Sequence, residues 1–246
     1  MKKYELTEET KTLAGGTVLH RIRALRDIPR HGVKAGELGG FVEGENNLSQ
    51  DGNAWVFGDA RVYGDARVSS DAWVFGNAEV FGDAKVYDTA KVCGNACVSD
   101  NAWVSDNAWV SGNACVYGNA FVCGNANVRG NANVCGYAEV CGNAKVCGNA
   151  NVRGYAKVRG YAEVCGDAKV RGDADYMTFK NSWSSGRWFT YTRSNKKWKV
   201  GYFYGTGEEL IKKAYADSEL SGRCYEAIVR AVDTIEAAKA EVEEEK

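Results

Sequence analysis

The chain has 246 residues, of which 45% are hydrophobic, and its formal net charge at pH 7 is −1. This length and apolar content suit one well-packed domain, or one domain with a small appendage. The charge balance argues against a nucleic-acid mimic, which needs strong negative charge. No run is apolar and long enough to span a membrane, and the charged start around Lys2, Lys3 and Glu5 does not resemble a signal peptide. We therefore expect a cytoplasmic protein without a membrane partner.

Residues 1–35 precede the regular part of the chain and are predicted to form an irregular N-terminal cap. From Gly36 onward an imperfect version of the following repeat begins, with Leu38, Val42 and Leu48 at its core positions. A cap is expected here because the end of a repeat array exposes unpaired strand edges and apolar side chains.

Residues 36–175 are governed by a period of six. Twenty valines stand six residues apart from Val56 to Val170, and twenty-one alanines do the same from Ala54 to Ala174. The consensus Ala-x-Val-x-Gly-(Asn/Asp) gives a short strand with Ala and Val inward, then a turn at residues that tolerate left-handed backbone. Three hexads close one coil, so residues eighteen apart stack at the strand spacing of about 4.8 Å. We predict an all-β solenoid, a left-handed parallel β-helix of about six to seven coils.

Nine cysteines are an odd number, and in a reducing cytoplasm free thiols are the default. Three pairs stand eighteen residues apart, which brings their Cα atoms within disulfide range but with parallel Cα–Cβ directions that suit a bridge poorly. These pairs are Cys97 with Cys115, Cys123 with Cys141, and Cys147 with Cys165. Small side chains filling surface ladders are the preferred interpretation. Zinc is not expected, because the chain has no Cys-x-x-Cys motif and no histidine in the repeats.

Sorting the outward positions by eighteen separates three faces of the predicted prism, and aromatic side chains crowd its first half. One face carries Trp55, Phe57, Trp73, Phe75 and Trp109. A monomer rarely leaves such a contiguous aromatic patch in water, so self-association, most simply as a parallel homotrimer, is the favoured explanation. The alternative is that the N-terminal segment or the C-terminal tail folds back over this face.

Residues 176–246 are predicted to form a small α+β cap. Residues 188–193 and 198–204 are β-rich runs on either side of a short turn, which predicts a hairpin. Thr206 and Glu209 have the spacing of a capping box, so a helix is expected to begin there. A second, amphipathic helix is expected after it.

Residues 176–207 mix cations with aromatic rings and contain no acidic side chain. Such a mixture binds nucleotides or single strands, with phosphates on Arg and Lys and bases on the rings. The predicted ligand site comprises Arg187, Arg193, Lys197 and Lys199 for phosphates and Trp183, Trp188 and Trp198 for stacking. The alternative is that these residues only close the end of the solenoid.

Catalysis would need residues that the chain scarcely supplies. Hexapeptide β-helices often belong to acyltransferases, which use a general base, usually His, in a groove between subunits. His20 and His31 are the only histidines, both ahead of the regular coils, and His20 lies in residues 18–25, which look like a capping strand. No catalytic residue, metal ligand or cofactor is therefore predicted.

The stretches that flank the repeats resemble a known family. Residues 20–27 (HRIRALRD), 33–43 (VKAGELGGFVE), 47–56 (NLSQDGNAWV) and 178–210 are similar to the hexapeptide-repeat proteins of phages, prophages and gut bacteria. Members are often labelled acyltransferases or left uncharacterised. The resemblance implies a left-handed β-helix, an oligomer and a phage origin. It supplies no catalytic residue, so the acyltransferase label is an analogy of fold.

The predicted function is a non-enzymatic, oligomeric β-helix scaffold whose C-terminal module binds an anionic ligand, a nucleotide or a nucleic acid. If the chain is phage-encoded, it acts in the host cytoplasm, and sequestering a nucleotide signal of host defence is one concrete role. Two alternatives stay open: an acyl-CoA-dependent acyltransferase acting at a subunit groove, and a purely structural or assembly protein.

Overall fold

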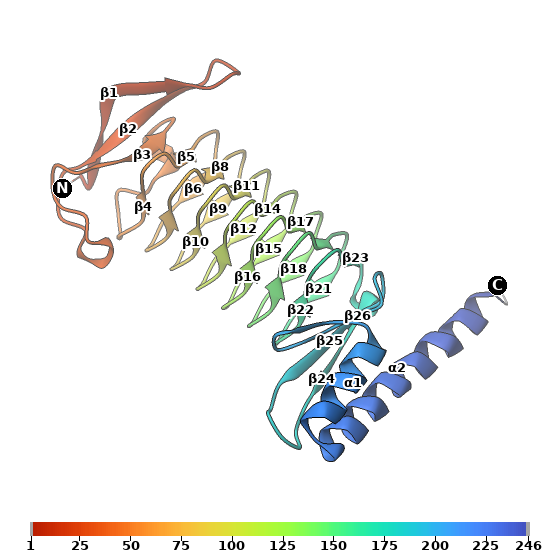
Figure 1. Cartoon of the computed structure of the whole chain (residues 1–246). Helices are drawn as coiled ribbons and strands as arrows, with labels where there is room; N and C mark the ends of the chain where they lie inside the picture. The colour runs from red at the N-terminus through yellow and green to blue at the C-terminus, as the bar shows by residue number, and fades with distance from the viewer. Residues whose placement is uncertain (1, 245–246) are drawn as a thin grey trace. The chain divides into compact units, whose positions relative to one another are not determined.

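The computed structural model describes residues 2–244. The chain divides into two compact units, Met1–Asp175 and Tyr176–Lys246. The first unit contains the repeats, and the second contains the C-terminal strands and helices (Figure 1). Residues 1, 245 and 246, which belong to the predicted N- and C-terminal caps, lie outside the described residues.

Twenty strands of two residues each form the regular part of the first unit, and each ends on a valine of the six-residue period. They are β4 (Trp55–Val56), β5 (Arg61–Val62), β6 (Arg67–Val68), β7 (Trp73–Val74), β8 (Glu79–Val80), β9 (Lys85–Val86), β10 (Lys91–Val92), β11 (Cys97–Val98), β12 (Trp103–Val104), β13 (Trp109–Val110), β14 (Cys115–Val116), β15 (Phe121–Val122), β16 (Asn127–Val128), β17 (Asn133–Val134), β18 (Glu139–Val140), β19 (Lys145–Val146), β20 (Asn151–Val152), β21 (Lys157–Val158), β22 (Glu163–Val164) and β23 (Lys169–Val170). Each pairs in parallel with the strand one coil away; Val110, for example, is in register with Val92 and Val128.

The strands stack into three parallel sheets, one for each side of the coil. One sheet has six strands, from β6 to β21, and another has seven, from β4 to β22. The third passes through β5 and β8 to β23, and N-terminal strands extend it to ten. One strand per coil in the seven-stranded sheet gives about seven coils, which follow one another along the solenoid in Figure 1. The β-solenoid predicted from the repeat is therefore confirmed.

The alanines and valines of the period fill the interior of the solenoid. From Ala54 to Val170, each of them is at most 1% exposed. Burial of one valine side chain stabilises the fold by about 1.5–3 kcal/mol. Stacked columns of these side chains therefore hold successive coils together.

The corners of the coil require glycine and short polar residues. Gly112 has a φ of 72°, and a Cβ atom there would lie 3.0 Å from the backbone N and O of Gly130 in the next coil. A larger residue would therefore meet both a strained backbone and a steric clash. At the next position, Asn95 Nδ2 donates to Asn113 Oδ1, and Asn113 Nδ2 to Asn131 Oδ1, each at 3.0 Å. These amide ladders connect neighbouring coils.

The N-terminal segment adds strands to the ten-stranded sheet. β1 (Tyr4–Thr12) and β2 (Val18–Ala24) form an antiparallel hairpin, and β2 also pairs antiparallel with β3 (Leu38–Val42), which runs parallel to β5. Leu48 forms a parallel bridge to Val68, so it occupies the predicted core column. Leu38 does not, because it pairs with Arg23 of β2 instead of a coil, and it is 46% exposed. Short 3₁₀ turns occur at Pro29–His31, Glu45–Asn47 and Asp173–Asp175.

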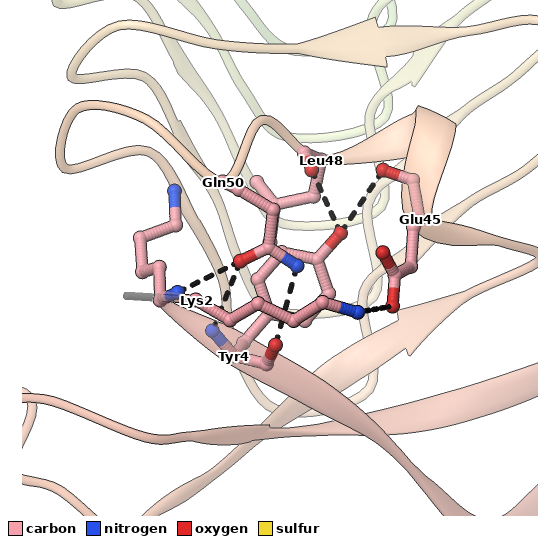
Figure 2. A network of polar contacts seen from close by, with 6 residues as sticks. Lys2, Tyr4, Glu45, Leu48 and Gln50 are labelled. Carbon is pink, nitrogen blue, oxygen red and sulfur yellow. Dashed lines mark hydrogen bonds and ion pairs between the residues drawn. The ribbon is translucent and has the colours of Figure 1, made fainter.

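Polar contacts fasten the start of the chain to the first coils (Figure 2). Gln50 Oε1 accepts hydrogen bonds from the backbone N of Lys3 and Tyr4 at 2.8 and 3.2 Å, and Gln50 Nε2 donates to the carbonyl of Tyr4 at 3.2 Å. The Tyr4 hydroxyl donates to the carbonyl of Leu48 at 2.7 Å. Lys2 forms an ion pair with Glu45 at 2.6 Å. Burial raises the pKa of Tyr4, as expected for a hydroxyl enclosed by the first coils.

The second unit is a four-stranded antiparallel sheet followed by two helices. The elements are β24 (Tyr176–Lys180), β25 (Trp188–Thr192), β26 (Lys197–Val200), β27 (Phe203–Gly205), α1 (Gly207–Asp217) and α2 (Glu219–Glu244). β25 and β26 form the predicted hairpin, but a turn at Gly201 and Tyr202 divides the predicted run 198–204 into β26 and β27, which pair antiparallel. β24 pairs with the other side of β25. The predicted capping box is confirmed: Glu209 N donates to Thr206 Oγ1 at 3.3 Å, and Thr206 N donates to Glu209 Oε2 at 2.7 Å.

Candidate functional site: aromatic and charged columns

The aromatic face predicted to meet a second subunit is partly covered by the chain's own N-terminal segment. Trp55 is 0% exposed, and the ring of Tyr4 packs edge-on to it with 6.3 Å between ring centroids. The ring of His31 packs edge-on to Trp73 at 4.3 Å. The alternative of a folded-back N-terminal segment therefore describes this region, and the assignment of Trp55 to a subunit interface is corrected.

The rest of the predicted interface set is less enclosed. Phe57 and Phe75 are half-buried beside Trp73, and Trp109 is 43% exposed. Lys91 lies between two of the rings, with its Nζ 5.3 Å from the centroid of Trp73 and 5.7 Å from that of Trp109. The hollow around this lysine has a volume of about 440 Å³. The accessible aromatic surface of this sheet therefore centres on Trp109.

Neither histidine is placed as an obvious general base. Both ring nitrogens of His31 are buried and have no hydrogen-bond partner among residues 2–244. Desolvation, with a smaller contribution from the charge of Arg30, lowers the pKa of His31 to about 4. Nδ1 of His20 lies 3.3 Å from the carbonyl oxygen of Thr7. His31 therefore acts as a packing residue of the N-terminal cap.

Two of the three stacked cysteine pairs form disulfide bonds, which overturns the preference for free thiols. The bonds join Cys123 to Cys141 and Cys147 to Cys165. Their Cα atoms are 4.7 and 4.6 Å apart, so in-register coils bring the thiols together without displacing the backbone. Cys97 and Cys115 stack in the same way but are free, and burial raises the pKa of Cys97 to about 11.

The C-terminal sheet separates the predicted ligand residues between two faces, because alternate residues of a strand point to opposite sides. Trp198 lies with Phe189, Tyr191 and Val200 in the hydrophobic core that the sheet forms with the helices, and it is 1% exposed. Its ring centroid is 5.1 Å from that of Tyr191. The prediction that Trp198 stacks on a ligand is therefore corrected to a core role.

Trp183 and Arg193 also make contacts within the second unit. Trp183 packs against Phe189 and Tyr225 with ring centroids 6.3 and 6.2 Å apart. Arg193 forms a two-point ion pair with Glu236 of α2, in which Nε and Nη2 each lie 2.7 Å from a carboxylate oxygen. An anionic ligand would have to compete with Glu236 for this guanidinium.

The remaining predicted residues are closer to the surface. Lys197 and Lys199 occupy alternate positions of β26, and Trp188 lies on the same face of β25. Lys180 of β24, which was not predicted, pairs with Trp188 and places its Nζ 6.0 Å from the ring centroid. Arg187 is exposed immediately before β25. None of the four strands contains an acidic residue, so this face of the sheet carries positive charge.

A groove of about 830 Å³ lies on the six-stranded sheet, and none of its residues belongs to the predicted sites. Its main charged and aromatic lining residues are Asp65, Arg67, Asp83, Lys85, Trp103 and Phe121. Arg67, Lys85, Trp103 and Phe121 form one column through successive coils. Lys85 Nζ lies 4.6 Å from the ring centroid of Trp103. The eighteen-residue spacing of this column was the sequence signal that could have revealed it.

The stacked hexads define this chain as a parallel β-solenoid protein. A family model described as the YdcK β-solenoid repeat matches residues 60–76, about one coil of the first unit. No curated protein matches the chain. The similarity supports the repeat architecture and carries no information on an activity or a source.

Two further findings concern membranes and metals. α2 is as long as a membrane-spanning helix, but charged residues occur along it, and within residues 2–244 no helix is both long and apolar enough to cross a bilayer. In the same part of the chain, no three His, Cys, Asp or Glu side chains are grouped to hold a metal ion.

Proposed function

We propose that the chain is a non-enzymatic binding protein, in which the β-solenoid is a rigid scaffold and the C-terminal unit binds an anionic ligand, a nucleotide or a nucleic acid. One observation carries the proposal: Lys180, Lys197 and Lys199 share one face of the C-terminal sheet with the ring of Trp188. Lysines attract phosphate groups, and an indole ring accepts a stacked base.

Acidic side chains of α2 are engaged by arginines within the same unit, which supports the proposal. Glu236 is paired with Arg193 at 2.7 Å. Glu226 and Asp233 lie 3.8 and 3.5 Å from Arg230. The arginines partly neutralise these carboxylates, so the carboxylates repel an anion bound at the sheet less strongly.

No observation favours the acyltransferase alternative. Such an enzyme needs a base within hydrogen-bond reach of the acceptor hydroxyl or amine. The ring nitrogens of His31 are buried among aromatic rings, and Nδ1 of His20 faces a backbone carbonyl. We therefore keep a binding function and a purely structural function as the two outcomes to be separated.

Calorimetric titration of the full chain with mono-, di- and cyclic nucleotides and with a short oligothymidylate separates them. Cyclic nucleotides are included because sequestration of a nucleotide defence signal by a phage-encoded protein is the most specific form of the proposal. We expect one of these ligands to bind, more weakly as salt rises, because the contacts are ionic. Lys197→Ala and Lys199→Ala should each lower the affinity by about tenfold.

Lys212→Ala is the matched control, because it removes an exposed lysine of α1 in the same unit without touching the sheet. Its affinity should equal that of the parent chain. A chain that binds none of the ligands, or an equal loss in the Lys212 variant, would reject the proposal and favour a structural or assembly protein.

A further inference from the structure

Charged residues in neighbouring coils of this solenoid commonly pair with opposite charges. Arg61 and Glu79, in register on the ten-stranded sheet, form an ion pair at 2.9 Å. Lys145 and Glu163 do the same on the seven-stranded sheet at 2.8 Å. Opposite charges at directly paired positions stabilise a sheet. These surface charges are therefore explained by the stability of the coils.

The groove on the six-stranded sheet is built differently. Arg67 lies in register with Lys85, and Asp65 and Asp83 stand one coil apart along the neighbouring corner. Within the described part of the chain, none of these four side chains forms an ion pair. Like charges at paired positions destabilise a sheet. The cation–π contact between Lys85 and Trp103, at 4.6 Å, offsets part of this repulsion. It leaves Arg67, Asp65 and Asp83 without a role in coil stability, whereas a bound ligand would give them one.

Aromatic rings and amides continue the two columns. Trp103 follows Lys85 in register, and Phe121 follows Trp103, with ring centroids 6.3 Å apart. Trp103 is 41% exposed. Asn101 and Asn119 line the groove along the same corner, in the two coils that follow the acidic pair. Over four successive coils, one side of the groove therefore offers cations and ring faces, and the other offers carboxylate and amide groups.

These groups together select a neutral, polyhydroxylated ligand. A polyanion would meet Asp65 and Asp83, and a polycation would meet Arg67 and Lys85, so neither is favoured. Carboxylate and amide oxygens accept hydrogen bonds from hydroxyl groups, and the cations and amide nitrogens donate to them. The faces of aromatic rings pack against the C–H faces of a sugar ring. The groove volume of about 830 Å³ is within the range of small-molecule sites.

The coil spacing of about 4.8 Å is close to the length of one sugar residue in an extended chain, so successive sugars can meet successive coils. The corner column continues beyond Asn119 with the stacked rings of Tyr137 and Tyr155, which are 55% and 72% exposed and 5.2 Å apart. We propose that this groove binds a neutral oligosaccharide along the solenoid axis, with Trp103 and Phe121 as stacking platforms. The site lies in the first unit and does not depend on the anionic ligand proposed for the second.

An array of neutral gluco-, manno-, galacto- and N-acetylglucosamine oligosaccharides, followed by calorimetry with the best of them, tests the proposal on the full chain. At least one should be retained, with an affinity that salt hardly changes because the ligand is uncharged. Trp103→Ala and Phe121→Ala should each weaken binding by about tenfold or more. Tyr117→Ala is the control, because it removes an exposed ring from the ten-stranded sheet, outside both the groove and the expected subunit interface.

Circular dichroism and light scattering of each variant show whether it keeps its fold and its mass. A loss of binding can then be distinguished from unfolding or from dissociation of an assembly. Retention of no neutral oligosaccharide would overturn the proposal, and so would an equal loss in the Tyr117 variant. Oligothymidylate binding that Trp103→Ala weakens and Lys199→Ala does not would assign the groove to a nucleic acid and overturn the proposal. A change of mass in the Trp103 variant would assign it to contact between copies of the chain.

Discussion

His31 is enclosed in its neutral form, and this makes the N-terminal cap sensitive to acid. Its ring centroid lies 4.3 Å from that of Trp73 and 6.3 Å from that of Phe57. Desolvation, with a contribution from the charge of Arg30, lowers its pKa from 6.5 to about 4, although Asp71 opposes this shift. A protonated ring would lose its hydration here, and this cost outweighs the contributions of Asp71 and of the Arg30 backbone, which favour the charged form.

The cap should therefore lose stability as the pH falls from about 6.5 towards 4. In this window the unfolded chain binds a proton at His31 and the folded chain does not, so protons favour the unfolded state. Hydrogen exchange of the backbone in residues 26–34, corrected for its intrinsic pH dependence, should show less protection in the acid part of this window. His31→Phe keeps a ring in place and removes the titration, so it should remove the effect. An unchanged pH dependence in that variant would contradict the role of His31.

Local sequence does not distinguish Trp55 from Trp109. Both stand in the tripeptide Ala-Trp-Val at the same hexad position, yet Trp55 is buried and Trp109 is not. Tyr4, which lies far away in sequence, packs edge-on to Trp55 and contributes to the difference. The core columns, by contrast, depend on alternation within each hexad and on stacking of identical coils. The solenoid could therefore be predicted from the sequence, whereas the covered part of its surface could not.

The alternation of residues along the C-terminal strands predicts which side chains share a face, whereas the composition of the segment does not. Lys197 and Lys199 alternate with Trp198 and Val200 along β26, so a period of two already places Trp198 on the opposite face from the lysines. The ion pair that Arg193 forms with α2 has no such signal. Its two partners are separated by forty-three residues, and they meet only because the helix packs on the sheet.

The register of the stacked coils should also determine which cysteines form disulfide bonds. Alkylation of the oxidised chain in denaturant without reductant should label Cys93, Cys97, Cys115, Cys135 and Cys224 only. Each disulfide closes a loop of eighteen residues and should stabilise the fold by about 3 kcal/mol in the chain-entropy account. Reduction should therefore lower the midpoint of thermal unfolding, and Cys123→Ser with Cys147→Ser should reproduce the change.

Peptide mapping by mass spectrometry provides the control for the thiol prediction. It should recover the two linked pairs and no peptide that joins Cys97 to Cys115. Labelling of all nine cysteines in the oxidised chain would show that register alone does not form the bridges.

The three faces of the first unit differ, although their core is uniform. The ten-stranded sheet carries the N-terminal hairpin, the six-stranded sheet carries the oligosaccharide groove proposed above, and the seven-stranded sheet carries the surface around Trp109. Inward Ala and Val are the same in every coil, so outward residues can vary without changing the fold. Separate surfaces of one scaffold can therefore serve separate partners.

Self-association is the prediction that belongs to the whole molecule. Trp109 and the half-buried Phe75 lie on the seven-stranded sheet and, unlike Trp55, are not fully buried. Burying their rings against another copy would remove apolar surface from water, and three prisms packed side to side form a closed assembly. We expect a trimer with a mass of about 80 kDa, three times the 26.7 kDa of one chain.

Light scattering after size-exclusion chromatography measures this mass directly. Phe75→Ser with Trp109→Ser should shift it towards one chain while the far-UV spectrum stays the same, because the solenoid core is not touched. Tyr117→Ser is the control, since it removes an exposed ring from the ten-stranded sheet and should leave the assembly intact. If the parent chain already has the mass of one subunit, the seven-stranded sheet is not a subunit interface, and its exposed rings need another partner.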